Sequence, residues 1–313
     1  MAIPTQINKA VIYFLQYLEI EKNLSRLTIR NYRFYLNFLV DWMKTKNIEL
    51  VTDFNQDNLR DFRLFLAHYQ NRRKEFLAKK TQSFYLIALR SFFKWLVKND
   101  LPVLNPEKIE LPKSESIQMK FSPVDGILKM MDMADLYDPR GLRDRAIMEL
   151  LFSTGLRVSE LVSLNCDQIN LERKEFGVIG KGRRPRVVFL SERACRYLDL
   201  YLRGRKDHWK PLFVRMDNKR KSLLLEDNQI RLTSRSVQRI VDKYCRLAHL
   251  PVKLSPHGIR HSFATDLLFN GANLRDVQEM LGHKSIVTTQ IYTHVTKPQL
   301  KKIYQQFHFS NKK

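Results

Sequence analysis

The first hundred residues carry apolar side chains at α-helical spacing, and this pattern constrains the fold more than any other feature of the chain. Apolar residues that recur three, four and seven positions apart line one face of a helix. Such stripes comprise Val11, Phe14, Leu15 and Leu18; Leu36, Leu39, Val40 and Met43; Leu59, Phe62 and Leu66; and Leu89, Phe92, Phe93 and Leu96. Four amphipathic helices joined by short polar connections predict a small bundle with its apolar faces inward.

The rest of the chain has a mixed pattern. A length of 313 residues favours two domains, and the stretch 105–119, with its prolines and loss of periodicity, predicts a linker between domains at 1–104 and 120–313. The β-prone runs EFGVIG and RVVFL flank the basic turn KGRRP and predict a hairpin. The fold class is therefore mainly α with a small antiparallel β-sheet (α+β). Further helices are expected at 124–135, 141–153, 158–164, 191–203, 234–248, 256–269, 274–281 and 297–307.

The charge of the chain points to a polyanionic partner. A formal net charge of +23 favours nucleic acid, although ribosomal and membrane-surface proteins share this bias. Basic and polar side chains near the predicted helix starts of the first domain can meet phosphates and base edges. These candidate DNA-binding residues are Arg26, Thr28, Arg30, Asn31, Lys79, Lys80, Thr81, Gln82 and Arg90.

Several classes of protein do not fit the sequence. No apolar run reaches the length of about 18 residues that suggests a membrane span, and the N-terminus lacks the features of a signal peptide. Cys166, Cys195 and Cys245 are odd in number and widely spaced, which argues against a disulfide framework or a cysteine zinc site. We therefore expect a cytoplasmic protein that does not contact a membrane.

The segment LSPHGIRHSFATDLL carries the sharpest local signal for a site. Ser255 is a good N-cap and Pro256 suits the first helical position, so His257 and Arg260 share a face near a helix N-terminus, which favours an anion. His257 and His261 have the spacing of a helical zinc pair, but the glutamate of HExxH is missing and Arg260 would repel a cation.

The stretch GKGRR has a superficial likeness to a phosphate-binding P-loop. The preceding glycines are too close together, and Gly182 stands where a P-loop needs Ser or Thr. Nucleotide binding is therefore not expected, and the sequence predicts neither a cofactor nor a metal.

The order of four motifs identifies a family. RVSEL, a lysine in a β-turn, HGIRHSFAT and LGHKSIVTTQIYTH follow one another along the chain. This order resembles the signature of the tyrosine recombinases, the phage-integrase and Xer group, over residues 120–305. SRLTIRNYRFYLNFL and ALRSFFKWL resemble that family's N-terminal core-binding, SAM-like domain. The resemblance implies a C-shaped clamp around double-stranded DNA and a catalytic domain that ends in a C-terminal helix.

The resemblance also implies a chemical role for each motif. Tyr292 would attack the scissile phosphate and form a 3′-phosphotyrosyl link. A phenol with a pKa near 10 needs help to do so at pH 7, and His257 would be the general base. Lys181, on the hairpin, would protonate the leaving 5′-oxygen. Its basic neighbours Arg183 and Arg184 are expected to contact DNA.

Two arginines would stabilise the transition state. The resemblance implies that Arg157 and Arg260 clamp the non-bridging oxygens, which gather negative charge that a guanidinium fork matches in geometry. His283 would hydrogen-bond the phosphate. Arg157 alone also fits an exposed residue at a helix start. Glu160, three positions later, either orients Arg157 or His257 or is an exposed helix residue.

The assembly and biological role stay open at this stage. The family exchanges strands within a tetramer on two DNA sites, homomeric or heteromeric, and the tail from residue 296 either packs on its own chain or docks on a neighbour. Xer-like dimer resolution and mobile-element integration both fit. A non-catalytic DNA-binding regulator and a type IB topoisomerase-like enzyme are the alternatives, and Tyr304 is the second candidate nucleophile. Residues 205–233 exceed the family's usual connection and suggest a basic hairpin touching DNA.

Overall fold

The protein folds as two compact units. The computed structural model describes residues 3–112, 124–180, 185–216 and 226–282. The chain separates into an N-terminal unit, residues 1–117, and a C-terminal unit, residues 118–313. The domain limits expected from the sequence stay a prediction. The packed part of the N-terminal unit extends past residue 104, because Ile109 is fully buried in its core.

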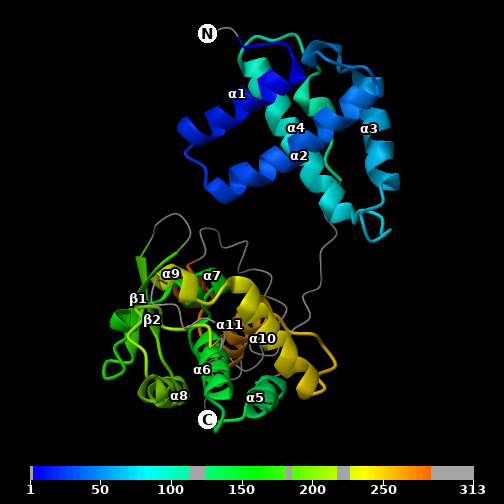
Figure 1. The fold of residues 1–313 in the computed structure, drawn as a ribbon. Coiled ribbons are helices and arrows are strands. Elements are labelled where there is room, and N and C mark those ends of the chain that lie inside the picture. The colour runs from blue at the N-terminus through cyan, green and yellow to red at the C-terminus, as the bar shows by residue number, and fades with distance from the viewer. Residues whose placement is uncertain (1–2, 113–123, 181–184, 217–225, 283–313) are drawn as a thin grey trace, which may run out of the picture. The chain divides into compact units, whose positions relative to one another are not determined.

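The N-terminal unit is a bundle of helices (Figure 1). Every residue of the four predicted apolar stripes is buried, which confirms the bundle. Aromatic rings fill its centre, where the ring of Phe14 lies 5.4 Å from Phe92 and 5.5 Å from Trp95, centroid to centroid. The elements are α1 (Ile7–Ile20), α2 (Arg26–Thr45), η1 (Val51–Asp53), α3 (Gln56–His68), α4 (Lys79–Lys98) and η2 (Pro106–Lys108).

Loss of an aromatic ring from the centre of the bundle is expected to destabilise the N-terminal unit. Phe92 is fully buried, so Phe92→Ala is expected to lower the free energy of unfolding by about 3–5 kcal/mol through lost burial and a cavity. Phe76 is 61% exposed and provides the matched control; Phe76→Ala should change stability by less than about 0.5 kcal/mol. Urea unfolding measures both. A small effect of Phe92→Ala would contradict this packing.

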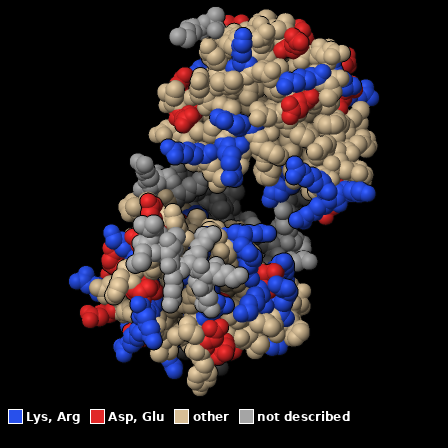
Figure 2. Space-filling model, viewed as in Figure 1, with Lys and Arg blue, Asp and Glu red and all other residues tan. Residues whose placement is uncertain are grey.

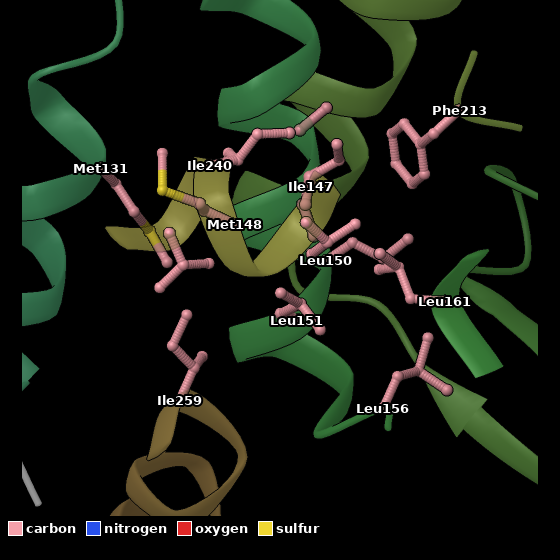
Figure 3. Packing of buried hydrophobic residues seen from close by; sticks show 14 of the residues in the cluster. Met131, Ile147, Met148, Leu150, Leu151, Leu156, Leu161, Phe213, Ile240 and Ile259 are labelled. Carbon is pink, nitrogen blue, oxygen red and sulfur yellow. The ribbon is translucent and has the colours of Figure 1, made fainter. Parts of the chain in front are cut away.

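The C-terminal unit is built around one central helix. Helix α6 (Pro139–Thr154) packs against α5 (Val124–Asp132), α8 (Glu192–Gly204), α10 (Ser234–Leu247) and α11 (Pro256–Phe269) (Figure 1). It is buried on all sides, and Figure 3 shows its apolar side chains meeting those of its neighbours. The remaining elements are α7 (Val158–Ser163), η3 (Cys166–Gln168), α9 (Asp227–Ile230) and α12 (Leu274–Leu281).

A two-stranded antiparallel sheet completes the C-terminal unit. Strand β1 (Glu175–Ile179) pairs with β2 (Pro185–Phe189), with Phe176 opposite Val188 and Val178 opposite Arg186. The predicted hairpin and the α+β fold class are therefore confirmed. The predicted helices of this unit agree with the observed ones to within a few residues, except that the one expected at 297–307 lies outside the described residues.

The segment 205–233 is partly core. Leu212 and Phe213 are buried in the centre of the C-terminal unit, and the Arg205 guanidinium donates to the carbonyl oxygens of Pro211 at 2.8 Å and Trp209 at 3.0 Å. An antiparallel bridge joins Val214 and Arg231, and two backbone hydrogen bonds flank it, from the Arg215 amide to the Ile230 carbonyl at 2.9 Å and from the Leu232 amide to the Phe213 carbonyl at 3.2 Å. The rest of the expected basic hairpin, residues 217–225, lies outside the described residues.

Among the residues with a described structure, no helix is both long and apolar enough to span a bilayer.

Candidate active site

The start of α11 presents two of the predicted site residues. The Ser255 hydroxyl accepts a hydrogen bond from the Gly258 amide at 3.1 Å, so it caps the helix as the sequence predicts. His257 lies on the first turn and is exposed. Arg260, one turn later, is only 2% exposed. The helix therefore holds an accessible imidazole beside a buried guanidinium.

Arg260 ties together the ends of two helices. Its Nη1 donates to the Gly155 carbonyl and its Nη2 to the Leu281 carbonyl, each at 2.6 Å. Gly155 ends α6 in the left-handed conformation, with φ of 59°. A side chain at that position would meet the Phe263 ring at 2.5 Å, so a glycine is needed there.

Arg157 begins α7 and is held by Glu160. Arg157 Nη1 donates to Glu160 Oε1 at 2.8 Å, and the Arg157 amide donates to Glu160 Oε2 at 2.9 Å. Its Nη2 reaches the Gly282 carbonyl at 3.4 Å. The Arg157 side chain is 28% exposed, whereas that of Glu160 is 6% exposed. Glu160 is thus a buried carboxylate in contact with Arg157.

A third arginine, which the sequence reasoning missed, joins the same carboxylate. Arg186 on β2 donates from Nη1 to Glu160 Oε1 at 3.0 Å, from Nη2 to Glu160 Oε2 at 2.7 Å and from Nε to the Met280 carbonyl at 3.0 Å. Its position in the strand could have revealed it. Residues two apart in a strand share a face, and Val188, two positions after Arg186, is buried. An arginine on the inward face of a strand needs an internal partner.

These hydrogen bonds decide the charge of Glu160. Burial alone would raise the pKa of the carboxyl group, but the hydrogen bonds from Arg186 and Arg157 outweigh it and lower the pKa to about 2. Glu160 is therefore ionised throughout the physiological range. Each of its oxygens accepts from both arginines.

The three arginines meet at the C-terminal end of α12. Arg186, Arg260 and Arg157 donate to the successive carbonyls of residues 280, 281 and 282. The last carbonyls of a helix have no partner within it and form its negative end. We call this arrangement the α12 carbonyl cap. It fixes the guanidinium groups of Arg157 and Arg260 at one place, immediately before residue 283.

His257 belongs to the same site. Partial desolvation of its imidazole, followed by the positive charges of Arg260 and Arg157, lowers its pKa below the ordinary value of 6.5. Its Nε2 lies 3.0 Å from the Nε2 of His261, so one ring donates and the other accepts. Among the described residues no group of three or more His, Cys, Asp or Glu could hold a metal ion.

The predicted DNA-binding residues lie at the starts of α2 and α4 or further along α4. Thr28, Gln82 and Arg90 are among those whose side chains make contacts within the N-terminal unit. The Thr28 hydroxyl hydrogen-bonds that of Ser25 at 2.8 Å, Gln82 donates to the Leu77 carbonyl at 2.8 Å, and Arg90 forms an ion pair with Glu107. The exposed members are Arg26, Arg30, Asn31, Lys79 and Lys80, while Thr81 is half-buried. On the face that Figure 2 shows, basic side chains cover more surface than acidic ones.

Part of the predicted site falls outside the described residues. The structure brings together Arg157, Glu160, His257 and Arg260. The others, for which it gives no position, are Lys181, Arg183, Arg184, His283 and Tyr292. The described part is a cationic site beside a neutral imidazole. Such a site suits a phosphodiester group, and it stands on a two-unit helical fold.

Comparison with known proteins identifies the family. The model of the phage integrase family matches residues 120–299, and the model of the phage integrase N-terminal SAM-like domain matches residues 11–100. The chain therefore belongs to the phage integrase family. It is a tyrosine recombinase, a site-specific enzyme that cleaves and rejoins DNA strands.

Similar proteins cover almost the whole chain. Tyrosine recombinase XerD of Listeria innocua is 37% identical over 302 residues, which is 96% of this chain and 99% of that protein. Tyrosine recombinase XerC of Bacillus subtilis is 33% identical over 296 residues, 94% of each. The crystal structure of XerA recombinase matches at 29% identity and a TM-score of 0.51, covering 97% of this chain and 99% of that one. A lambda integrase dimer bound to a core site shares the fold, with a TM-score of 0.69 at 14% identity, over 90% of this chain and 97% of that one.

Proposed function

We propose that Tyr292 attacks the scissile phosphate of a recombination site and forms a 3′-phosphotyrosyl intermediate with release of a 5′-hydroxyl. The observation that carries this proposal is the α12 carbonyl cap, which holds Arg157 and Arg260 beside His257. The segment that bears Tyr292 follows this cap directly in the chain. The phosphotyrosine conserves the energy of the broken bond, so rejoining requires no high-energy cofactor.

Each side chain has a defined task in this reaction. Arg157 and Arg260 neutralise the non-bridging oxygens as charge builds on the phosphorane, a stabilisation that depends on donors fixed in advance. His257 accepts the phenolic proton of Tyr292, since its lowered pKa leaves it neutral at pH 7. Lys181 protonates the leaving oxygen, and His283 hydrogen-bonds the phosphate.

The relatives favour a Xer-like role. Near full-length similarity to proteins named XerC and XerD supports resolution of chromosome or plasmid dimers, with mobile-element integration or excision as the second possibility. We further propose a clamp around DNA and a homo- or heterotetramer on two sites, with exchange of C-terminal helices. The exposed basic residues at the starts of α2 and α4 would contact the DNA backbone. The expected cytoplasmic location stays a prediction.

A covalent trap tests this function. A suicide duplex carries the binding site, selected from genomic fragments, with a nick near the scissile phosphate so that the cleaved strand diffuses away. The wild-type chain should then stay attached to DNA on a denaturing gel. A non-catalytic regulator would bind the duplex without an adduct. A topoisomerase-like enzyme would relax a supercoiled plasmid that lacks the site, whereas the recombinase should not.

The pH dependence of cleavage should report His257. A base is active when unprotonated, so the adduct-forming rate is expected to be maximal above the His257 pKa and to fall below it, at a pH under 6.5. Glu160, with a pKa of about 2, stays ionised and does not contribute. Single-turnover rates measured across pH give this acidic limb of the pH–rate profile. His257→Asn should slow cleavage by about 10²–10⁴ and flatten the limb; an unchanged limb would remove His257 as the base.

A further inference from the structure

We propose that Arg186 is a positioning residue of the recombinase, which holds Arg157 in its cleavage geometry by locking Glu160 and the end of α12. The inference rests on the proposed function, since it concerns the same site. Arg186 would touch neither the phosphate nor the nucleophile. It acts through Glu160, which contacts both Arg186 and Arg157.

Arg186 joins two helices, because it hydrogen-bonds Glu160 on α7 and the Met280 carbonyl on α12. Two of its nitrogens grip both oxygens of Glu160 as a fork, at 3.0 and 2.7 Å, and a third reaches the Met280 carbonyl at 3.0 Å. Its side chain is 8% exposed. A planar guanidinium with donors in fixed directions holds a carboxylate in one orientation, which a lysine cannot do.

Glu160 passes this restraint on to Arg157. The same two oxygens accept from the Arg157 side chain and amide at 2.8 and 2.9 Å. With Arg186 removed, the buried carboxylate keeps one arginine partner and loses the fork that fixes its orientation. Arg157 keeps its hydrogen bonds to Glu160 and to the Gly282 carbonyl, but a carboxylate that can turn holds it less firmly, so the alignment of two guanidinium groups on one phosphate is weakened.

The backbone after α12 fits closely around Arg186. Gly282 has φ of 64°, and a Cβ built there would lie 3.2 Å from Arg186 Cδ. The close approach places Arg186 directly against the residue that precedes His283. Arg186 also stands on β2, opposite Val178 on β1, so it anchors the base of the hairpin whose connection carries Lys181. One side chain thus links three parts of the predicted site.

A second arginine of the same unit offers a matched control. Arg193 donates to Glu149 at 2.8 Å, and Glu149 is a buried carboxylate that Arg145 also grips. Arg193→Gln therefore removes one of two arginines from a buried carboxylate, as Arg186→Gln does, but at Glu149 rather than Glu160. Comparison of the two variants separates a loss of stability from a loss of positioning.

The experiment compares single-turnover adduct formation, DNA affinity and thermal stability of the full-length chain. Arg186→Gln should slow adduct formation by about 10- to 100-fold with unchanged DNA affinity. Arg186→Lys should recover part of the rate. Arg193→Gln should match the wild-type rate even where its melting temperature falls as far. If Arg186→Gln does not fold, Arg186→Lys carries the test, and it must still cleave more slowly than Arg193→Gln.

A double-mutant cycle tests whether Arg186 acts on cleavage through Glu160. If Arg186 acts through Glu160, then Glu160→Gln combined with Arg186→Gln should cleave no more slowly than the slower single variant. Losses that multiply would overturn the inference, and so would a wild-type rate in Arg186→Gln. A wild-type chain that forms no adduct at all would instead refute the proposed function, so the two failures are distinguishable.

Discussion

Tyr292→Phe is expected to abolish covalent attachment to the suicide duplex while DNA binding stays intact. The substitution removes one oxygen, the atom that would bond to phosphorus, and keeps the aromatic ring. No other group in the proposed mechanism can form the 3′-phosphotyrosyl bond. A denaturing gel measures the adduct, and a native gel with the same duplex measures binding.

Tyr304 supplies the control for this experiment. It follows Tyr292 in the chain and carries the same reactive group, but it has no role in the proposed mechanism, so Tyr304→Phe should form the adduct at the wild-type rate. If Tyr292→Phe still forms the adduct and Tyr304→Phe does not, the nucleophile is Tyr304. Phosphopeptide mapping of the trapped complex gives an independent assignment.

Arg260→Ala is expected to lower the adduct-forming rate by about 10²–10³, the cost of losing one preorganised donor to a developing oxyanion. The substitution also leaves the Gly155 and Leu281 carbonyls without this donor, at a cost of about 1–3 kcal/mol for each carbonyl left buried and unpaired. Stability should therefore fall together with activity. Urea unfolding and single-turnover cleavage measure the two effects separately.

Two further variants make the Arg260 prediction specific. Arg260→Lys keeps the charge but cannot donate to two carbonyls and a phosphate in one plane, so it should stay well below the wild-type rate. Arg203 on α8 has a side chain that is 78% exposed, and Arg203→Ala should change neither rate nor stability. A wild-type rate in Arg260→Lys would show that charge alone suffices and that the fork geometry is irrelevant.

The sequence was sufficient for the helices because their signals are local. The stripe through Leu89, Phe92 and Leu96 lies within one helix, and a single period predicts both the helix and its buried face. The Ser255 cap and the hairpin around residues 181–184 depend on neighbouring residues in the same way. These parts of the fold agree with the structure.

The contacts of the site were less predictable because they are long-range. Arg186 reaches Glu160 across 26 positions and Met280 across 94, and no local pattern records such a pair. For the same reason, the sequence did not show whether Glu160 orients another side chain or is an exposed helix residue. Its partner Arg186 comes near only in the folded chain.

Two segments contain buried apolar residues that their local composition does not indicate. Leu212 and Phe213 are core residues in the segment 205–233, whose surrounding basic residues obscured this short apolar run; the DNA-touching hairpin expected there stays a prediction. The linker expected from residue 105 contains Ile109, which is buried against the helical bundle. In both segments a few apolar side chains are buried although most of their neighbours in the sequence are polar or charged.

The structure of the Tyr292→Phe chain bound to its recombination site tests the proposed active site most directly. We expect Arg157 and Arg260 each to donate, at about 3 Å, to non-bridging oxygens of one phosphate while both keep their hydrogen bonds to the carbonyls at the end of α12. Guanidinium groups on two different phosphates, or turned away from the DNA, would contradict this expectation.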